Sequence, residues 1–561
     1  TVSDLENYAK GFYMNLTGKG LRADGSENLD DLNTLDERSD NRLVASPDQW
    51  LFNEWVIPSE ANFDSKWYWN NIRNLNYFMT RYQRVNATES EVNPVVAVIR
   101  FFRAFDYFDK IKTFGDVPWY EKDLTTADID ELYKARDDRD FVLGKIIEDL
   151  EFAIEWLPEK SAAEVGALHK DAARTFLARV CLHYGTYKKY HNVSTSPTSQ
   201  ELLQKAATLA KEVMDSGLYD IVQGSDAGAN QSAFADYPLY YANQFTQEDL
   251  TTNKECILAR VFEADVLTHN LARGGGVGLS KDFAESFLCK DGLPIANSSE
   301  YKGDETLDDE MANRDPRMYQ IIDSKYRPYT VKSNGMRVVN SGIDDKKEFS
   351  PSEEPGTNVH SAPGLTGTAT GYSPIKLVSA SSQQDAVKTS SYDWFVFRYA
   401  EILLIYAEAK CELGECTQAV LDETINKLRD RVEMKHLTVS PVADLNPVDY
   451  GYSITPLLYE IRRERRIELA LEGFRYDDIM RWNAMKLFEN PKTYLGMRVT
   501  DKVKALYQPE VFEGSTARDL IEYNGKTYIR MYSGKSLNEA GRKWTGNDKR
   551  LYYPIPTSQI T

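Results

Sequence analysis

The segment that most constrains the fold of this chain is a charged stretch around residues 460–475. If it is helical, four glutamates at four-residue spacing lie along one ridge: Glu460, Glu464, Glu468 and Glu472. Like charges at this spacing repel, so the ridge requires cations. The helix itself carries Arg462, Arg463, Arg465 and Arg466, and neighbouring segments offer Arg398, Arg429, Arg431 and Arg475. Apolar residues interleave with these charges, so we predict an architectural helix that packs into the protein with its charges paired.

The composition limits the partners of the chain. A net charge of −19 and a pI near 5.0 disfavour nucleic acid and anionic membrane surfaces, because clustered cations bind both. The sequence has no apolar run near eighteen residues, so we expect no membrane-spanning helix. Five cysteines in so long a chain do not describe a disulfide framework, and buried thiols are the favoured interpretation.

Helical periodicity divides the chain into four regions. Residues 1–217 form an N-terminal helical region with helices expected at 61–82, 90–114, 141–156, 169–187 and 200–216. Residues 218–395 are rich in Gly, Ser, Asn, Asp and Thr and are interpreted as a loop-rich, ligand-binding region. Residues 396–489 return to helices at 397–414, 417–431 and 455–473, and residues 490–561 are expected to be an irregular tail. The small-large rhythm of 172–185 recurs at 400–414 and is typical of degenerate tetratricopeptide helices.

A search for catalytic and metal-binding motifs finds little. HExxH, GxSxG, GxGxxG and CxxC are all absent, and the six histidines are scattered. Adjacent aspartates occur at several places, but in a chain with 86 acidic residues such pairs carry little information. We therefore expect no enzyme activity, no cofactor and no bound metal.

Six sequence blocks in a fixed order carry a resemblance to a known family. They are RAFDYF (103–108) leading into FGDVP (114–118), FLCKDGLP (287–294), DPR (315–317), YAEILLIYAEAK (399–410) with RDR (429–431), RRERRIELALEGFRYDDIMRW (462–482) and YPIP (553–556). Together they resemble the RagB/SusD family, the surface glycan-binding lipoproteins of Bacteroidetes. The resemblance extends over nearly the whole chain.

The resemblance implies a fold and a function. The fold would be mostly α, a single SusD-like domain over residues 1–561, with tetratricopeptide-type helical pairs as a frame and a long irregular insertion. The function would be non-catalytic capture of oligosaccharide or polysaccharide at the outer membrane and its delivery to a SusC-like TonB-dependent transporter. The only link to the membrane would be a lipidated cysteine upstream of this sequence.

Aromatic residues in loops are the first candidates for glycan contacts, because a protein holds sugar rings by stacking aromatic faces on them and by hydrogen-bonding their hydroxyls. In one segment Trp50 and Trp55 flank Asn53 between two prolines, which favours an ordered loop, and the resembled family places a Trp and an Asn near this point. Trp67 lies close by, although its helical context favours packing. In the second segment Tyr237, Tyr240 and Tyr241 precede amide side chains.

Two other functions stay open. A helical-repeat protein of this kind can bind peptides or other non-glycan cargo, and an acidic glycoside hydrolase would release sugars from polysaccharide. Glycan binding that is lost in a Trp50→Ala or Trp55→Ala variant would disfavour the peptide-binding function. Absence of released sugar after long incubation with polysaccharide would disfavour the glycoside hydrolase.

Overall fold

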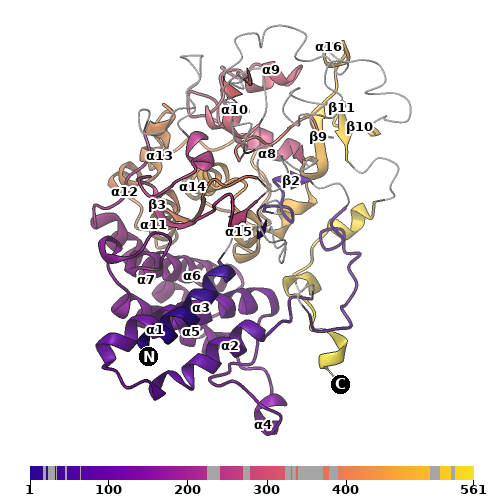
Figure 1. Ribbon diagram of the computed structural model, residues 1–561. Coiled ribbons are helices and arrows are strands. Elements are labelled where there is room, and N and C mark those ends of the chain that lie inside the picture. The colour runs from indigo at the N-terminus through magenta and orange to yellow at the C-terminus, as the bar shows by residue number, and fades with distance from the viewer. Residues whose placement is uncertain are drawn as a thin grey trace. The chain divides into compact units, whose positions relative to one another are not determined.

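A computed structural model describes sixteen stretches of the chain, and Figure 1 shows them as coloured ribbon. They are residues 1–16, 21–22, 32, 35–43, 47–62, 65–223, 241–269, 278–322, 330–331, 337–338, 370–377, 384, 389–505, 519–531, 537–546 and 548–560. The contacts divide the chain into two compact units. We call the first, residues 1–16, 53–217 and 545–561, the helical unit and the second, residues 17–52 and 218–544, the mixed unit. One boundary falls after Gly217, where the N-terminal helical region was predicted to end; the predicted single domain stays a prediction.

The helical unit is built almost entirely from helices. They are α1 (Val2–Lys10), η1 (Gly11–Asn15), α2 (Asn70–Met79), η3 (Tyr82–Arg84), α3 (Glu89–Phe114), α4 (Ile129–Leu132), α5 (Arg139–Trp156), η4 (Lys160–Ala162), α6 (Lys170–Tyr190), α7 (Ser199–Asp215), η14 (Lys549–Leu551) and η15 (Thr557–Gln559). Three of the long helices start at side-chain caps: Thr88 and Thr198 form capping boxes, and Asp138 accepts the amide of Asp140.

Successive helices of this unit pack against each other. α3 packs on α5, α5 on α6, and α6 on α7 (Figure 1). Gly185 permits the close approach of α6 and α7, because a Cβ at this position would lie 2.9 Å from Cγ of Leu203. Between α3 and α5, the buried Arg103 holds Asp149 through two hydrogen bonds of 2.7 Å. The bounds of α3, α5, α6 and α7 confirm four of the five helices predicted before residue 217 to within a few residues.

The fifth prediction, one helix over residues 61–82, is wrong in its first half. The helix α2 begins only at Asn70, and residues 65–69 are turn and extended chain. Trp67 and Trp69 pack there edge to face, with ring centroids 5.2 Å apart. Trp67 therefore packs from a non-helical segment, and the predicted helical periodicity holds only for α2.

The mixed unit contains shorter helices and several small sheets. Its helices are η6 (Asn243–Thr246), α8 (Lys281–Ser286), α9 (Leu307–Met311), α10 (Arg317–Ile321), α11 (Tyr399–Glu412), α12 (Gln418–Glu423), α13 (Ile425–Arg431), α14 (Pro456–Glu468), α15 (Arg475–Arg481), η10 (Met485–Glu489), η11 (Pro491–Tyr494), α16 (Asp501–Lys504) and η13 (Glu539–Arg542). Its strands are β1 (Leu21–Arg22), β2 (Arg42–Leu43), β3 (Cys256–Arg260), β4 (Leu267–Thr268), β5 (Gly278–Leu279), β6 (Thr330–Val331), β7 (Arg337–Val338), β8 (Trp394–Arg398), β9 (Leu495–Arg498), β10 (Asp519–Tyr523) and β11 (Lys526–Arg530).

Two antiparallel sheets organise this unit. β3 pairs with β8, which leads directly into α11, and both strands are buried throughout. The second sheet has the order β10-β11-β9, and its hairpin turns at Asn524 and Gly525, both with positive φ. The prediction of an irregular tail after residue 490 is therefore wrong for these strands, because we overlooked the Asn-Gly turn signal between them.

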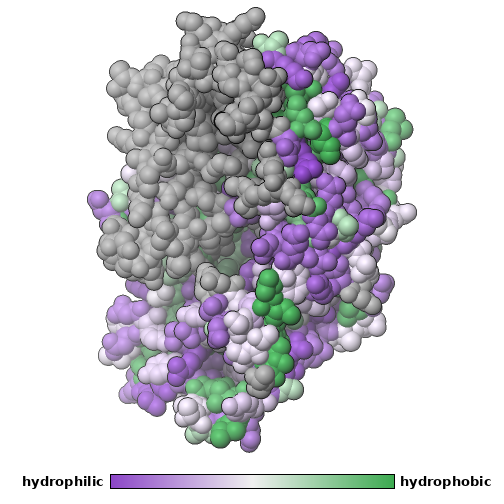
Figure 2. Space-filling model, turned by 90° about the vertical axis from the view of Figure 1, so that its right-hand side faces the viewer, coloured by the Kyte–Doolittle hydropathy of each residue, from purple (hydrophilic) through white to green (hydrophobic). Residues whose placement is uncertain are grey.

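Of the helices that the structure describes, none is long and apolar enough to cross a membrane. Figure 2 shows one face of the molecule, where hydrophilic residues cover most of the described surface and hydrophobic residues form small groups.

Candidate functional site

The charged helix predicted from the glutamate spacing is α14, and it is buried on nearly all sides. Glu468 pairs with three guanidinium groups at 2.6–3.0 Å: Arg431, Arg398 and Arg317. Burial alone would raise the pKa of Glu468, but these cations hold it well below its usual range. This buried cluster of ion pairs connects α10, α13, β8 and α14.

Half of the eight predicted cations pair with the ridge: Arg398, Arg429 and Arg431 from neighbouring segments, and Arg463 of α14 itself, which lies 3.2 Å from Glu460. Arg462, Arg465 and Arg466 pair with acidic residues elsewhere. Arg429 pairs with Glu464 at 2.9 Å, and Arg398 also holds Glu472 at 2.7 Å. Among the arginines from neighbouring segments, Arg475 is the exception, because it pairs with Asp40 at 2.7 Å. Sequence spacing could not anticipate that pair, whose members lie 435 positions apart.

Three of the seven predicted ligand residues are buried, which corrects their prediction as glycan contacts; for Trp67, packing was already the favoured interpretation. Trp50 is 2 % exposed, and its Nε1 donates to Tyr476 Oη at 3.1 Å. Tyr241 is fully buried, and its hydroxyl donates to the carbonyl of Glu468 at 2.7 Å. Trp67 is 8 % exposed and packs edge to face on Phe114. A ring whose faces are covered cannot stack on a sugar in this conformation.

Of the other four predicted ligand residues, two are half-buried and two lie outside the described residues. Asn53 is half-buried with a positive φ, in a turn that ends one segment of the mixed unit and begins the helical unit. Trp55 is also half-buried, and Lys549 Nζ lies 4.9 Å from the centroid of its ring. Tyr237 and Tyr240 lie outside the described residues.

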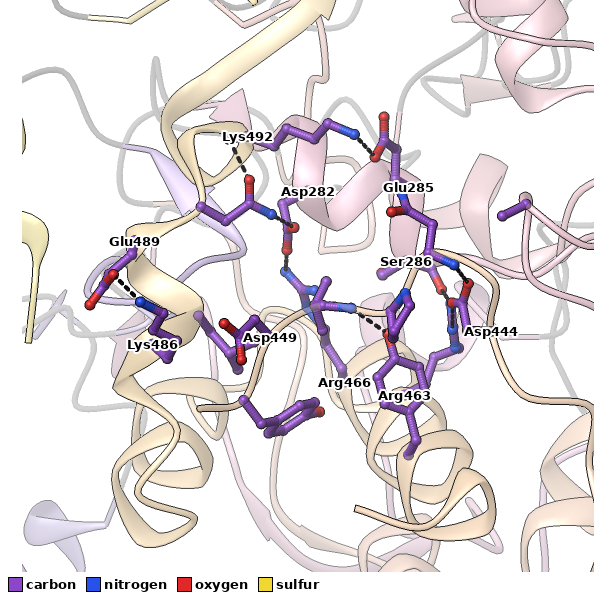
Figure 3. A pocket seen from close by; sticks show the side chains of 18 of the residues that line it. Asp282, Glu285, Ser286, Asp444, Asp449, Arg463, Arg466, Lys486, Glu489 and Lys492 are labelled. Carbon is purple, nitrogen blue, oxygen red and sulfur yellow. Dashed lines mark hydrogen bonds and ion pairs between the residues drawn. The ribbon is translucent and has the colours of Figure 1, made fainter. Parts of the chain in front are cut away.

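The mixed unit has a polar pocket of about 450 Å³ that sequence reasoning did not find (Figure 3). Residues of α8, α14, α15, η10 and η11 line it, together with the loop of residues 444–450 and the turn at Asn524. These segments are far apart in the sequence, so no local motif marks the site. The volume is within the range of roughly 300–1,000 Å³ that is usual for small-molecule sites.

The back of the pocket is held by α14 and α8. Arg466 Nη2 lies 2.8 Å from Asp282 Oδ2, and Asn490 Nδ2 donates to the other oxygen of the same carboxylate at 2.8 Å (Figure 3). Burial raises the pKa of Asp282, although Arg466 opposes the shift. Because both carboxylate oxygens are already engaged, Asp282 is poorly placed to act as a general acid.

The loop of residues 444–450 forms one wall and is fixed at both ends. At its start, Asn297 accepts the amide of Leu445 at 3.0 Å and donates to the carbonyl of Ala443 at 3.0 Å. Farther along, the hydroxyl of Tyr459 accepts the amide of Val448 at 3.0 Å. Backbone hydrogen bonding to side chains from two elements gives this wall a defined shape.

The pocket presents many hydrogen-bonding groups and few aromatic faces. Tyr459 and Tyr523 are half-buried at its lining, and Tyr450 is buried. Among the described residues there is no group of three or more His, Cys, Asp or Glu side chains that could hold a metal ion. The arrangement is suited to binding a polar ligand through many hydrogen bonds.

Comparison with known sequences identifies the class of protein. The profile of the SusD family matches residues 224–561, and a second profile, described as starch-binding associating with outer membrane, matches residues 21–182. The first match spans more than half of the chain, so the chain belongs to the SusD family. The family resemblance of the six sequence blocks is thereby confirmed.

Two curated relatives come from Formosa agariphila. SusD-like protein P2 is 26 % identical over 403 residues, 71 % of this chain and 66 % of its own length. SusD-like protein P38 is 37 % identical over 91 residues, 16 % of each chain. The chain thus spans just under two thirds of the length of P2.

Solved structures show the same fold. A SusD-like carbohydrate binding protein from Bacteroides fragilis aligns with a TM-score of 0.68 at 22 % identity, covering 100 % of this chain and 98 % of its own. A laminarin binding SusD-like protein aligns with a TM-score of 0.52 at 17 % identity, covering 100 % and 97 %. The predicted mostly helical, SusD-like fold is confirmed.

Proposed function

We propose that this protein captures oligosaccharide or polysaccharide at the bacterial outer membrane without cleaving it. The observation that carries the proposal is that the family match of residues 224–561 includes all the segments that line the polar pocket. Support also comes from the names of the two solved relatives, one a carbohydrate binding and the other a laminarin binding protein. A pocket rich in hydrogen-bonding groups matches a ligand covered with hydroxyls.

We further propose that the captured glycan passes to a SusC-like TonB-dependent transporter in the outer membrane. The matching profile described as starch-binding associating with outer membrane supports this location. The protein would be held there by a lipidated cysteine upstream of residue 1. Co-purification of the full-length, lipidated protein with a transporter from detergent-solubilised outer membranes tests this proposal, and the unlipidated protein in the soluble fraction serves as the control.

Binding by purified protein to a polysaccharide panel tests glycan capture. In affinity gel electrophoresis, we expect at least one polysaccharide to retard the protein, and isothermal titration should give saturable binding to its oligosaccharides. The pocket variant Asp449→Asn should weaken the binding. The matched control Asp265→Asn, at an exposed turn of the same unit, should not.

The same experiment separates the alternatives. Release of reducing ends during long incubation with the retarding polysaccharide would favour a glycoside hydrolase. Saturable binding of peptides with no glycan binding would favour a helical-repeat protein with peptide cargo.

Asn53, Trp55, Tyr237 and Tyr240 remain proposed glycan contacts in addition to the pocket. Trp55 is half-buried, and Asn53, two residues before it, has an amide side chain that can hydrogen-bond a hydroxyl. A Trp55→Ala variant that binds the best glycan as tightly as wild type would remove this segment from the proposal.

A further inference from the structure

The side-chain charges at the pocket wall neutralise each other within the wall. Lys486 pairs with Glu489 at 2.6 Å, Lys492 with Glu285 at 2.6 Å and Arg463 with Asp444 at 2.5 Å (Figure 3). Behind them, Arg466 is paired with Asp282, and the other two arginines of the lining are also paired, Arg475 with Asp40 and Arg462 with Glu412. An incoming ligand therefore meets cations whose charge is already balanced, and a sulfate or carboxylate would have to compete with a protein carboxylate for each of them.

Asp449 is the exception among the described acidic residues of the lining. It is exposed, and it forms no ion pair within the described residues; one carboxylate oxygen accepts the amide of Gly451 at 2.8 Å. Its negative charge acts on Lys486, whose pKa is raised first by the hydrogen bond to Glu489 and further by the charges of Glu489 and Asp449. The accessible end of the pocket thus carries two carboxylates around a single ammonium group.

The net charge of the whole chain also disfavours anionic ligands. A net charge of −19 repels polyanions beyond the pocket itself, within the screening length of about 8–10 Å at physiological salt. Local and global electrostatics therefore both disfavour an anionic ligand, while a neutral ligand experiences neither penalty.

From these observations we infer that the pocket binds a neutral, hydroxyl-rich saccharide and rejects sulfated and uronate-bearing ones. This inference rests on the proposed glycan capture and specifies its ligand class. A sugar hydroxyl donates one hydrogen bond and accepts others, so it can donate to Asp449 while accepting from Lys486, Asn446 or Asn524. The paired side chains keep this mixed set of donors and acceptors fixed in position.

The test uses one polysaccharide backbone in two charge states. The neutral polysaccharide that most strongly retards the protein is chemically sulfated, and oligosaccharides of equal length from both forms are titrated into the purified protein. The neutral oligosaccharide should bind at least about tenfold more tightly. Its Kd should change less than about twofold between roughly 0.05 and 0.5 M NaCl, since no ion pair forms with the ligand.

Variants locate the effect in the pocket. Asp449→Asn should weaken binding of the neutral oligosaccharide on the order of tenfold, because the amide oxygen still accepts a hydrogen bond but the charge-assisted bond becomes a neutral one. Asp449→Lys should reduce the preference for the neutral over the sulfated ligand, and Asp265→Asn should leave both affinities unchanged. Asp449 is exposed, and the hydrogen bond of its side chain is the local one to the amide of Gly451, so these variants should fold normally, which circular dichroism verifies.

The outcomes distinguish this inference from the function on which it rests. If no polysaccharide in the panel binds, glycan capture itself is contradicted, and the inference with it. If glycans bind but the tightest ligands are sulfated or uronate-bearing, or if Asp449→Asn binds the neutral ligand as wild type does, capture stands and the neutral ligand class is overturned.

Discussion

Arg466 on α14 holds Asp282 on α8 at 2.8 Å, and through this ion pair the buried charged helix becomes the back wall of the pocket. The same helix carries Glu464 and Glu468, which bind arginines from α10, α13 and β8. Arg466 also lies 3.3 Å from Asp40, next to β2. The scaffold and the candidate site are therefore connected through one helix of the mixed unit.

The three cations around Glu468 predict a large effect of neutralising it. Glu468→Gln leaves Arg317, Arg398 and Arg431 without their shared carboxylate, and breaking a buried ion pair from one side costs about 3–5 kcal/mol. Urea unfolding should show that the free energy of unfolding of Glu468→Gln is lower than that of wild type by about this amount. The exposed pair partner Glu415 provides the control, since Glu415→Gln should cost no more than about 1 kcal/mol. Equal losses in the two variants would contradict the role assigned to the buried cluster.

Gly185 and Gly144 predict opposite responses to the same substitution. A Cβ at Gly185 would lie 2.9 Å from Cγ of Leu203 on α7, so Gly185→Ala should lose about 1–3 kcal/mol of stability. Gly144 lies within α5, where a Cβ would meet no neighbouring atom within 4 Å, and Gly144→Ala should gain about 0.5–1 kcal/mol from helix propensity. Thermal unfolding of both variants measures the difference. A stabilised Gly185→Ala variant would show that α6 and α7 are less closely packed than described.

His269 predicts acid sensitivity of the mixed unit. Burial lowers the pKa of His269 from 6.5 to about 4, and its Nε2 lies 2.9 Å from the carbonyl oxygen of Tyr392. The neutral ring is favoured by folding, so its contribution to stability is complete above pH 6.5 and is lost as the pH falls through 4. The free energy of unfolding should therefore decline more steeply between pH 6.5 and 4 in wild type than in His269→Gln. The exposed His436→Gln should behave like wild type, and identical profiles for all three proteins would count against the assignment.

The buried Lys376 predicts that the free energy of unfolding also rises with pH in the alkaline range. Burial lowers the pKa of Lys376 from 10.5 to about 8, with Glu472 opposing the shift from 2.6 Å. Folding favours the neutral amine, so this group's contribution is complete above pH 10.5 and is lost as the pH falls through 8. Between pH 8 and 10.5, the free energy of unfolding should therefore rise less with pH in Lys376→Met than in wild type. Chemical unfolding at several pH values across this window measures it, and a variant with the wild-type slope would refute the shift.

The sequence predicted the elements whose signals are local. The four-residue spacing of Glu460, Glu464 and Glu468 determines a ridge on one helix, and any fold must supply cations for it. The predicted helix was too long, however, because α14 ends at Glu468 and Glu472 lies in the turn that follows. The helices predicted at 90–114 and 200–216 begin two residues after the caps Thr88 and Thr198, which are equally local signals. The Asn524-Gly525 turn between β10 and β11 was an equally local signal that we overlooked.

The site could not be predicted because its determinants are not local. Trp50 has the flanking residues of an exposed loop, yet its indole meets Tyr476, which lies 426 positions away. In the pocket, Asp282 and Asn490 are 208 positions apart. Only tertiary packing decides which of the many acidic side chains are neutralised, and this distinguishes Asp449 from the other described acidic residues of the pocket lining.

The most direct test of non-catalytic glycan capture is isothermal titration of the purified protein with oligosaccharides from the polysaccharide that retards it, combined with an assay for reducing ends. We predict saturable binding that is weakened on the order of tenfold in Asp449→Asn, unchanged in Asp265→Asn, and accompanied by no release of reducing ends. Release of sugars, or the absence of binding to every polysaccharide tested, would contradict non-catalytic capture.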